Sequence, residues 1–182
     1  MNVFVLNSGR CGSMTWIRAC EHIRNFSAGH ESRIHELGAA RLAYPPRHIE
    51  ADNRLSWQLG RLDEIWGNRA WYVHLTRDRD DAAASFARRS HFGIMQAWRE
   101  GVLLGAEADP MDLAHDYLDA VEANIRCFLR DKSQVMEARL ENLEEDFIRF
   151  WHWIGAEGDL TAARAALRIR HNASPPHPSP ES

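Results

Sequence analysis

Residues 5 to 18 combine the kinds of group that bind a phosphate or a sulfate. They read Val-Leu-Asn-Ser-Gly-Arg-Cys-Gly-Ser-Met-Thr-Trp-Ile-Arg. This order predicts a strand, a turn containing Gly9 and Gly12, and a helix with hydroxyl groups on its first turn. Free backbone N–H groups and the positive dipole end at a helix N-terminus favour an anion, and glycines let the backbone approach it closely. Arg10 could donate two parallel hydrogen bonds to the same anion.

The same segment lacks the lysine of the loops that bind nucleoside triphosphates. Those loops follow the pattern G-x-x-x-x-G-K-[ST], and no lysine follows Gly12 here. Ordinary phosphoryl transfer is therefore disfavoured, although a nucleotide phosphotransferase of the kinase type remains an alternative. The turn could also be a plain connection, with Ser8 or Ser13 as the N-cap of the helix.

A second segment, residues 71 to 89, repeats the arrangement of strand, turn and helix. It reads Trp-Tyr-Val-His-Leu-Thr-Arg-Asp-Arg-Asp-Asp-Ala-Ala-Ala-Ser-Phe-Ala-Arg-Arg. Arg77 ends the predicted strand, Asp80 or Asp81 is the predicted N-cap, and Ser85 lies eight residues after Arg77. Parallel sheets gather such groups at the carboxyl ends of their strands, so a guanidinium and a hydroxyl could meet on one phosphate.

With both segments in view, the chain resembles the sulfotransferases that use 3′-phosphoadenosine 5′-phosphosulfate (PAPS), as a short, bacterial-type member. Gly-Arg-Cys-Gly-Ser at residues 9 to 13 is similar to the family's loop for the 5′-phosphosulfate. The spacing from Arg77 to Ser85 is similar to its 3′-phosphate motif, R-(D/N)-P-x-D-x-x-x-S, with Arg79 in place of the proline. Glu137-Ala-Arg-Leu-Glu-Asn-Leu-Glu-Glu-Asp-Phe and Phe150-Trp-His-Trp-Ile-Gly resemble the late strand, turn and closing helix, so the likeness covers most of residues 2 to 156 in family order.

The resemblance implies a fold, a reaction and a set of ligands. The fold would be a three-layer α/β/α arrangement around a central parallel sheet, of the P-loop NTPase-like (sulfotransferase-like) type. A sulfuryl group would move in line from PAPS to a hydroxyl or amine, leaving 3′,5′-adenosine bisphosphate (PAP), with no metal. Arg10 would offset the charge that develops on the leaving phosphate. The implied cofactor-binding residues are Gly9, Arg10, Cys11, Gly12, Ser13, Thr15, Arg77 and Ser85.

Catalysis also needs a base that takes the acceptor's proton, and His30 and Glu31 are the candidates. Glu31 lies 21 residues after Arg10, about the interval at which the Golgi-type sulfotransferases place a catalytic glutamate. The alternative is that His30, Glu31 and Arg33 form a surface turn with local salt bridges. Three polar residues of the next predicted strand form a reserve set of bases: His48, Glu50 and Asp52.

The sequence departs from the family pattern in two places. One hydroxyl is displaced in the order Ser13, Met14, Thr15, Trp16, so Ser13 is the better phosphate ligand and Trp16 a weaker candidate for stacking on adenine. The glycine- and lysine-containing loop that clamps the 3′-phosphate in cytosolic eukaryotic members has no counterpart. Basic residues near the end of the chain could replace it, or could be a solvated face: Arg168, Arg170 and His171.

Two other chemistries are disfavoured by spacing. A phosphatase loop with Cys11 as nucleophile would need arginine in a C-x5-R pattern, and that position is Ile17. Cys11 therefore fills a small-residue position. His30 and His35 are five residues apart, so a helix would not bring them to one face as the zinc motif H-E-x-x-H requires. The three cysteines predict neither a disulfide framework nor a zinc site.

Composition predicts a compact cytoplasmic enzyme. The chain has 182 residues, 45% of them hydrophobic, which suits one domain over residues 1–172, and residues 173–182 form a proline-rich tail expected to be disordered. No apolar run is long enough to span a membrane. The net charge of −4 argues against nucleic-acid binding. A local cationic patch nevertheless suits a polyanionic cofactor: Arg77, Arg79, Arg88 and Arg89.

Hydrophobic periodicity supplies the elements that must position these groups. Strands are predicted at residues 2–7, 26–29, 47–51, 70–76 and 133–139. Four helical stripes lie between or after them: Ile17, Cys20 and Ile23; Leu55, Leu59, Leu62 and Trp66; Leu113, Tyr117, Val121, Ile125 and Phe128; and Leu143, Phe147, Phe150 and Ile154. The stretch from His91 to Asp109 is expected to shape the pocket of a small-molecule or glycan acceptor. A nucleotide-binding module without catalysis remains a further alternative, and the oligomeric state is left open.

Overall fold

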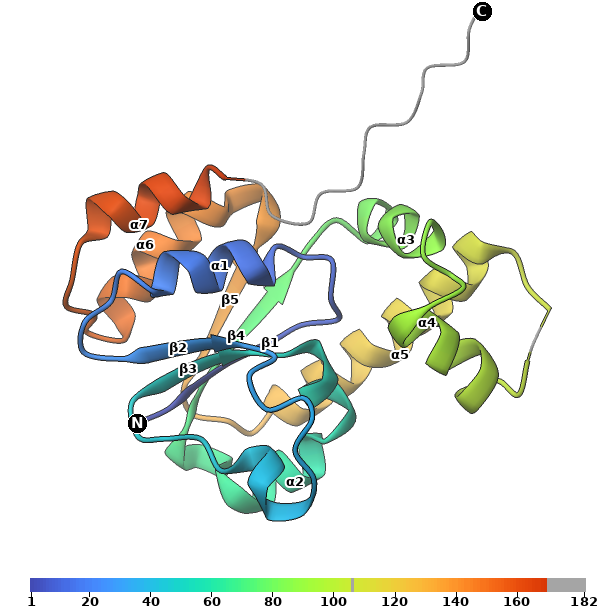
Figure 1. The fold of residues 1–182 in the computed structure, drawn as a ribbon, viewed down its shortest axis with the longest axis horizontal. Coiled ribbons are helices and arrows are strands. Elements are labelled where there is room, and N and C mark those ends of the chain that lie inside the picture. The colour runs from blue at the N-terminus through green and yellow to red at the C-terminus, as the bar shows by residue number, and fades with distance from the viewer. Residues whose placement is uncertain (106, 170–182) are drawn as a thin grey trace, which may run out of the picture.

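The computed structural model describes residues 1–105 and 107–169, in which strands and helices alternate (Figure 1). The strands are β1 (Val3–Leu6), β2 (Ser27–His30), β3 (His48–Ala51), β4 (Trp71–Thr76) and β5 (Val135–Arg139). The α-helices are α1 (Ser13–Cys20), α2 (Leu59–Ile65), α3 (Arg79–Ala87), α4 (Gly93–Gln96), α5 (Pro110–Leu129), α6 (Leu143–Trp153) and α7 (Leu160–Leu167). Short 3-10 turns cover Gly38–Leu42, Asn53–Trp57, Gly67–Arg69 and Leu140–Asn142, and Ala97–Val102 is π-helical.

The five strands form one sheet in the order β2-β3-β1-β4-β5, and every neighbouring pair is parallel. All four residues of the central strand β1 are buried, as expected for a strand that is covered on both faces. Strand β1 pairs with β3 on one side and with β4 on the other. The carboxyl end of β1 is therefore a switch point of the kind where open α/β sheets bind ligands.

Helices cover both faces of the sheet (Figure 1). On one face, α1, α6 and α7 bury a core that includes Trp16, Phe147 and Phe150. On the other face, α2, α3 and α5 bury a second core that includes Phe4 and Tyr117. The predicted three-layer α/β/α fold with a parallel central sheet is thus confirmed, and the predicted stripes on α5 and α6 face these two cores.

Three local predictions were wrong. The N-cap of α3 is Asp78, whose carboxylate accepts the N–H groups of Asp80 and Asp81, because the helix begins at Arg79. Neither Ser8 nor Ser13 caps α1, because Gly12 in a left-handed conformation takes that position. The stripe from Leu55 to Trp66 is two elements, a 3-10 turn and α2, separated at Gln58, where the backbone leaves the helical region.

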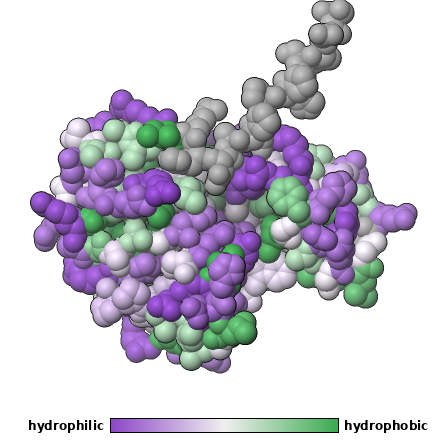
Figure 2. Space-filling model, viewed as in Figure 1, coloured by the Kyte–Doolittle hydropathy of each residue, from purple (hydrophilic) through white to green (hydrophobic). Residues whose placement is uncertain are grey.

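Most of the face seen in Figure 2 is hydrophilic, with hydrophobic residues in small, separate groups. Within the described ranges, no helix combines the length and the apolar character that crossing a bilayer would need. The predicted proline-rich tail from residue 173 lies outside the described residues, as do Arg170 and His171.

His74, at the centre of β4, ties the sheet to α5. Its Nε2 lies 2.6 Å from Glu122 on α5, and its Nδ1 lies 3.1 Å from Glu137 on β5. Burial alone would lower the pKa of His74, but hydrogen bonds to these two carboxylates raise it from 6.5 to about 9. The side chain is therefore an imidazolium at neutral pH, held between two acidic groups.

This raised pKa predicts a loss of stability at alkaline pH. The stabilisation is fully present below pH 6.5 and is lost as the pH rises through about 9, because the folded protein then releases a proton that the unfolded chain has already released. The expected change in unfolding free energy between pH 6 and pH 9.5 is at most about 3 kcal/mol. Urea titrations of the wild type and His74→Gln measure it. Parallel pH dependence in both proteins would contradict the assignment.

Candidate functional site

The loop between β1 and α1 requires glycine at two positions. Gly9 and Gly12 have φ angles of 97° and 85°, in the left-handed region that favours glycine. A Cβ on Gly12 would lie 2.6 Å from Leu140 Cδ1, and one on Gly9 would lie 3.0 Å from Asn53 Nδ2. Arg10, between them, also has a positive φ of 60°. The loop is therefore a tightly wound turn that carries the chain into the N-terminus of α1.

Buried hydrogen bonds hold this loop from behind. Asn7 Oδ1 accepts the N–H of Gly9 at 3.0 Å, and Ser56 Oγ donates to the carbonyl of Asn7 at 3.0 Å. Tyr117 Oη donates to the carbonyl of Ser8 at 2.7 Å. Sequence reasoning missed all three supporting side chains. An asparagine directly after a strand is a recognisable signal for a turn, whereas Ser56 and Tyr117 reach the loop only through the tertiary fold.

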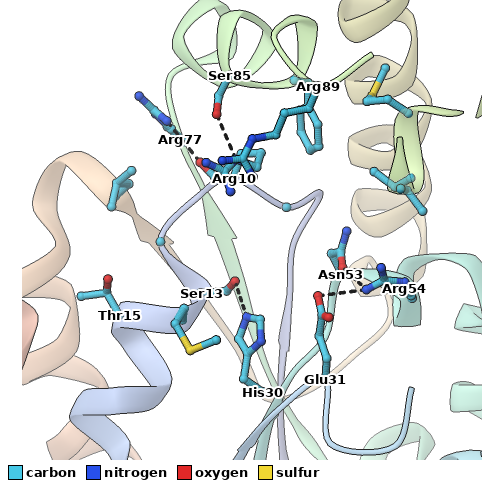
Figure 3. Close-up of a pocket in the computed structure, with 18 of the residues that line it drawn as sticks. Arg10, Ser13, Thr15, His30, Glu31, Asn53, Arg54, Arg77, Ser85 and Arg89 are labelled. Carbon is cyan, nitrogen blue, oxygen red and sulfur yellow. Dashed lines mark hydrogen bonds and ion pairs between the residues drawn. The ribbon is translucent and has the colours of Figure 1, made fainter. Parts of the chain in front are cut away.

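The two segments singled out by their spacing meet at this loop (Figure 3). Arg10 Nε donates to Ser85 Oγ at 2.9 Å, and Arg77 Nη1 donates to the carbonyl oxygen of Arg10 at 3.3 Å. Arg77 also forms an ion pair of 3.4 Å with Asp81. Two arginines and a serine from separate strand–helix connections are thus brought together beside the turn.

A cavity of about 730 Å³ opens at the carboxyl ends of the strands. This volume is within the usual range for small-molecule sites. Of the predicted cofactor-binding residues, Cys11 alone does not line it; the others do: Gly9, Arg10, Gly12, Ser13, Thr15, Arg77 and Ser85. Cys11 is buried, and burial raises the pKa of its thiol to about 12. The thiol is therefore protonated, which agrees with a small-residue role and not with a nucleophile.

The lining of the cavity is strongly cationic. It contains six arginines: Arg10, Arg54, Arg77, Arg88, Arg89 and Arg168. Glu31 is the one carboxylate among the lining residues that the structure describes. Burial, and then the neighbouring charges of Arg89, Arg77 and Arg88, lower the pKa of Arg10. An anion in the cavity would relieve this repulsion. Arg79, which the sequence placed in the cationic patch, instead forms an ion pair with Asp119 and does not line the cavity.

His30 and Glu31 also line the cavity, at the end of β2 (Figure 3). His30 Nε2 lies 3.0 Å from Ser13 Oγ, and burial lowers the pKa of His30, which favours the neutral imidazole. Glu31 Oε1 forms an ion pair of 2.9 Å with Arg54 Nη1. Arg33 donates elsewhere, to the carbonyl of Ala40. The alternative of a turn is therefore confirmed, since the N–H of Ile34 donates to the carbonyl of Glu31 at 3.2 Å, but the local salt bridges expected among His30, Glu31 and Arg33 are wrong.

The reserve set of bases lies outside the cavity. His48 and Glu50 on β3 and Asp52 directly after it are all buried, and none of them lines the cavity. Each is engaged with other buried groups: His48 with Glu50, and Asp52 with Arg41. An acceptor in the cavity could not contact them, so their prediction as bases was wrong.

Trp16 cannot stack on adenine, because it is fully buried in the core. Its ring packs against Phe147 and Phe150, with centroid separations of 5.1 and 5.0 Å. One apolar part of the cavity lining comes from the later part of the chain, and sequence reasoning did not identify it: Leu140, Leu143, Leu167 and Ile169. Arg168, which the sequence offered as a further basic residue, also lines the cavity. In the parts of the chain that the structure describes, no group of three or more His, Cys, Asp or Glu side chains is arranged to hold a metal ion.

Comparison with known proteins identifies the fold. No protein-family model matches the chain, and no curated protein matches it significantly in sequence. Among solved structures, the chain is similar to the "Sulfotransferase Domain from the Curacin Biosynthetic Pathway". The two structures align with a TM-score of 0.67 and 13% sequence identity, over 93% of this chain and 78% of that chain. At this identity the likeness shows the fold alone, which is sulfotransferase-like.

Proposed function

We propose that this protein is a sulfotransferase that moves a sulfuryl group from PAPS to a hydroxyl or amine of a small-molecule or glycan acceptor. The observation that carries the proposal is the meeting of Arg10, Arg77 and Ser85 beside a left-handed glycine turn, in a cavity lined by arginines. The sulfotransferase-like fold supports it.

The residues of the cavity fit PAPS. Arg10, Ser13 and the N-terminus of α1 would hold the 5′-phosphosulfate, because a helix N-terminus and a guanidinium both favour an oxyanion. Arg77 and Ser85 would hold the 3′-phosphate. The apolar wall formed by Leu140, Leu143 and Leu167 would accept the adenine ring. PAPS, when bound, supplies the sulfuryl group, and PAP is the leaving group.

The chain's own part in the reaction is to orient, to stabilise charge and to take a proton. Arg10 presents a cation where negative charge grows on the leaving phosphate. Glu31 is the proposed base: one of its oxygens pairs with Arg54, which orients the carboxylate inside the cavity. His30 is the competing base, because its lowered pKa favours the form that can accept a proton. We propose that Phe92, Ile94 and Met95, which also line the cavity, contact the acceptor.

Nucleotide preference tests this proposal against its alternatives. PAP is expected to bind far more tightly than 5′-AMP, because Arg77 and Ser85 provide for a phosphate that AMP lacks. Arg77→Ala should remove most of the difference, by roughly 10- to 150-fold in PAP affinity, the usual value of a charge-assisted contact. Isothermal titration calorimetry with PAP, AMP and ATP measures all three affinities.

Arg79→Ala is the matched control, since Arg79 lies two residues away on the same connection but pairs with Asp119 outside the cavity. Its PAP affinity should equal that of the wild type. Equal affinity of the wild type for PAP and AMP would exclude a sulfotransferase, and Mg²⁺-dependent ATP binding would favour the phosphotransferase instead.

A further inference from the structure

Glu50 is a fully buried carboxylate on β3 that the proposed reaction does not use. It stands opposite Gly29 of β2 in the parallel register, and its side chain passes over that glycine. A Cβ on Gly29 would lie 2.6 Å from Glu50 Oε2. The absence of a side chain at Gly29 therefore leaves a path for the Glu50 carboxylate along the surface of β2, toward the end where the cavity opens.

At the end of that path the carboxylate binds the residue after Glu31. Glu50 Oε1 accepts the backbone N–H of Ser32 at 2.7 Å, and Glu50 Oε2 accepts the hydroxyl of Ser32 at 2.6 Å. His48 Nε2 lies 2.9 Å from Glu50 Oε2 and supports the carboxylate from behind. His48 is in turn fixed by Ser27, whose Oγ lies 2.8 Å from His48 Nδ1.

Glu31 is held between two fixed neighbours. Its own N–H donates to the carbonyl of Ala51 at 3.0 Å, which continues the pairing of β2 with β3. Ser32, on its other side, is bound by Glu50. Between them Glu31 has a φ of 52°, a left-handed conformation that costs a non-glycine residue free energy. Such a conformation persists only where its surroundings impose it.

Asp52, which directly follows β3, anchors the partner of Glu31. Asp52 Oδ1 accepts the backbone N–H of Arg54 at 2.8 Å, and Arg54 forms the ion pair with Glu31. The other oxygen of Asp52 is held by the buried guanidinium of Arg41. Two buried carboxylates, Glu50 on β3 and Asp52 directly after it, thus fix the backbone beside both members of the pair in the cavity.

We propose that Glu50 is a positioning residue that sets the direction of the Glu31 carboxylate by holding Ser32. The inference rests on the proposed function, in which Glu31 takes the acceptor's proton. Glu50 acts through hydrogen bonds to Ser32 and touches neither donor nor acceptor. For the position of Glu31, the length of the Glu50 side chain, which lets it reach Ser32, should therefore matter more than its charge.

Three substitutions at Glu50 separate reach from charge. Glu50→Gln keeps the length and an oxygen for the Ser32 N–H, so its kcat should stay within about threefold of the wild type. Glu50→Asp keeps the charge but is one carbon shorter, and Glu50→Ala removes the group, so both should lose about 10- to 100-fold in kcat, the usual effect of a misplaced reacting group. Their KM for PAPS and their PAP affinity should not change. If Glu50→Ala does not fold, Glu50→Asp decides.

The same change in a Glu31→Gln background tests the route of the effect. If Glu50 acts through Glu31, adding Glu50→Asp to Glu31→Gln should cause no further loss of kcat, since the group being positioned no longer accepts a proton. A full additional loss in the double variant would show that Glu50 supports the site in some other way, and would overturn the proposal.

A thermal-melting experiment tests, without any enzyme assay, whether Glu50 holds the backbone of Glu31 in its left-handed conformation. In the otherwise wild-type chain, Glu31→Gly should melt about 2 °C above Glu31→Ala, because both variants lose the ion pair with Arg54 and glycine alone avoids the left-handed cost. With Glu50→Asp added, the backbone can relax, and the glycine variant should melt at or below the alanine variant. If Glu31→Gly melts above Glu31→Ala by the same amount with and without Glu50→Asp, the proposal is overturned. If the melting temperatures show that Glu50 holds the Glu31 backbone but no acceptor is ever sulfated, the proposed function has failed, and the structural role of Glu50 stands.

Discussion

Glu31→Gln is expected to abolish most sulfuryl transfer while PAP still binds as it does to the wild type. Glutamine keeps the size of the side chain and its ability to pair with Arg54, which lies 2.9 Å from Glu31 Oε1. It removes the basicity together with the negative charge, so the ion pair with Arg54 becomes a hydrogen bond. Loss of a general base costs about 100- to 10,000-fold in rate. Because Glu31 contacts neither Arg77 nor Ser85 in this structure, the donor side of the cavity should be unaffected.

The measurement is transfer of label from ³⁵S-PAPS to an acceptor found by screening alcohols, amines and glycans. His30→Ala should be milder than Glu31→Gln, because Glu31 is the proposed base and His30 contacts Ser13 at the start of α1. His35→Ala, an exposed histidine outside the cavity, is the matched control and should behave like the wild type. A nearly normal rate in Glu31→Gln together with an inactive His30→Ala would assign the base to His30 and contradict the prediction.

The fold was predictable because its signals are local. Each predicted strand ends in a polar turn, and the apolar stripes on α5 and α6 repeat at helical spacing over many residues. Arg10 and Arg77 could be found because each lies in the connection that follows a strand, and Ser85 because of its spacing from Arg77 on the next helix; parallel strands present their carboxyl ends at one edge of the sheet. They meet in one cavity because β1 and β4 are neighbours in the sheet.

The rest of the site depends on which strands are neighbours. Arg54 faces Glu31 because β3 pairs with β2, a pairing that no local pattern in either strand specifies. The N-cap of α3 was misplaced for a different reason. Asp78, Asp80 and Asp81 are equally good capping residues, and only the position at which the helix begins decides between them. Trp16 is aromatic beside a nucleotide-type loop in the sequence, yet the period of α1 turns its ring into the core.

The reserve bases show how burial changes the meaning of a residue. His48, Glu50 and Asp52 alternate along a strand, and such a pattern can face either a cavity or a covered layer. In this protein the face is covered by Tyr44, which stacks on His48, and by Arg41, which pairs with Asp52. Buried carboxylates with partners serve structure or positioning more readily than proton transfer to a substrate, because the substrate cannot reach them.

Arg10→Ala is expected to lower kcat by roughly 100- to 1,000-fold, the cost of removing a donor that stabilises charge in a transition state. The effect on PAP affinity should be smaller, because Arg77 and Ser85 still hold the 3′-phosphate and the charge on the leaving phosphate grows only during transfer. Steady-state kinetics over a range of PAPS concentrations, with calorimetry for PAP, separates the two quantities.

Arg10→Lys is the matched variant. Alanine and lysine both have to adopt the left-handed backbone conformation at this position, where φ is 60°, so any backbone cost is common to both. Lysine keeps a charge but loses the planar fork and the bond from Nε to Ser85. If charge alone stabilises the leaving phosphate, Arg10→Lys should recover most of the rate, whereas a loss close to that of alanine would show that directed hydrogen bonds are needed. A normal kcat in Arg10→Ala at saturating PAPS would mean that Arg10 only binds the donor, and would contradict the prediction.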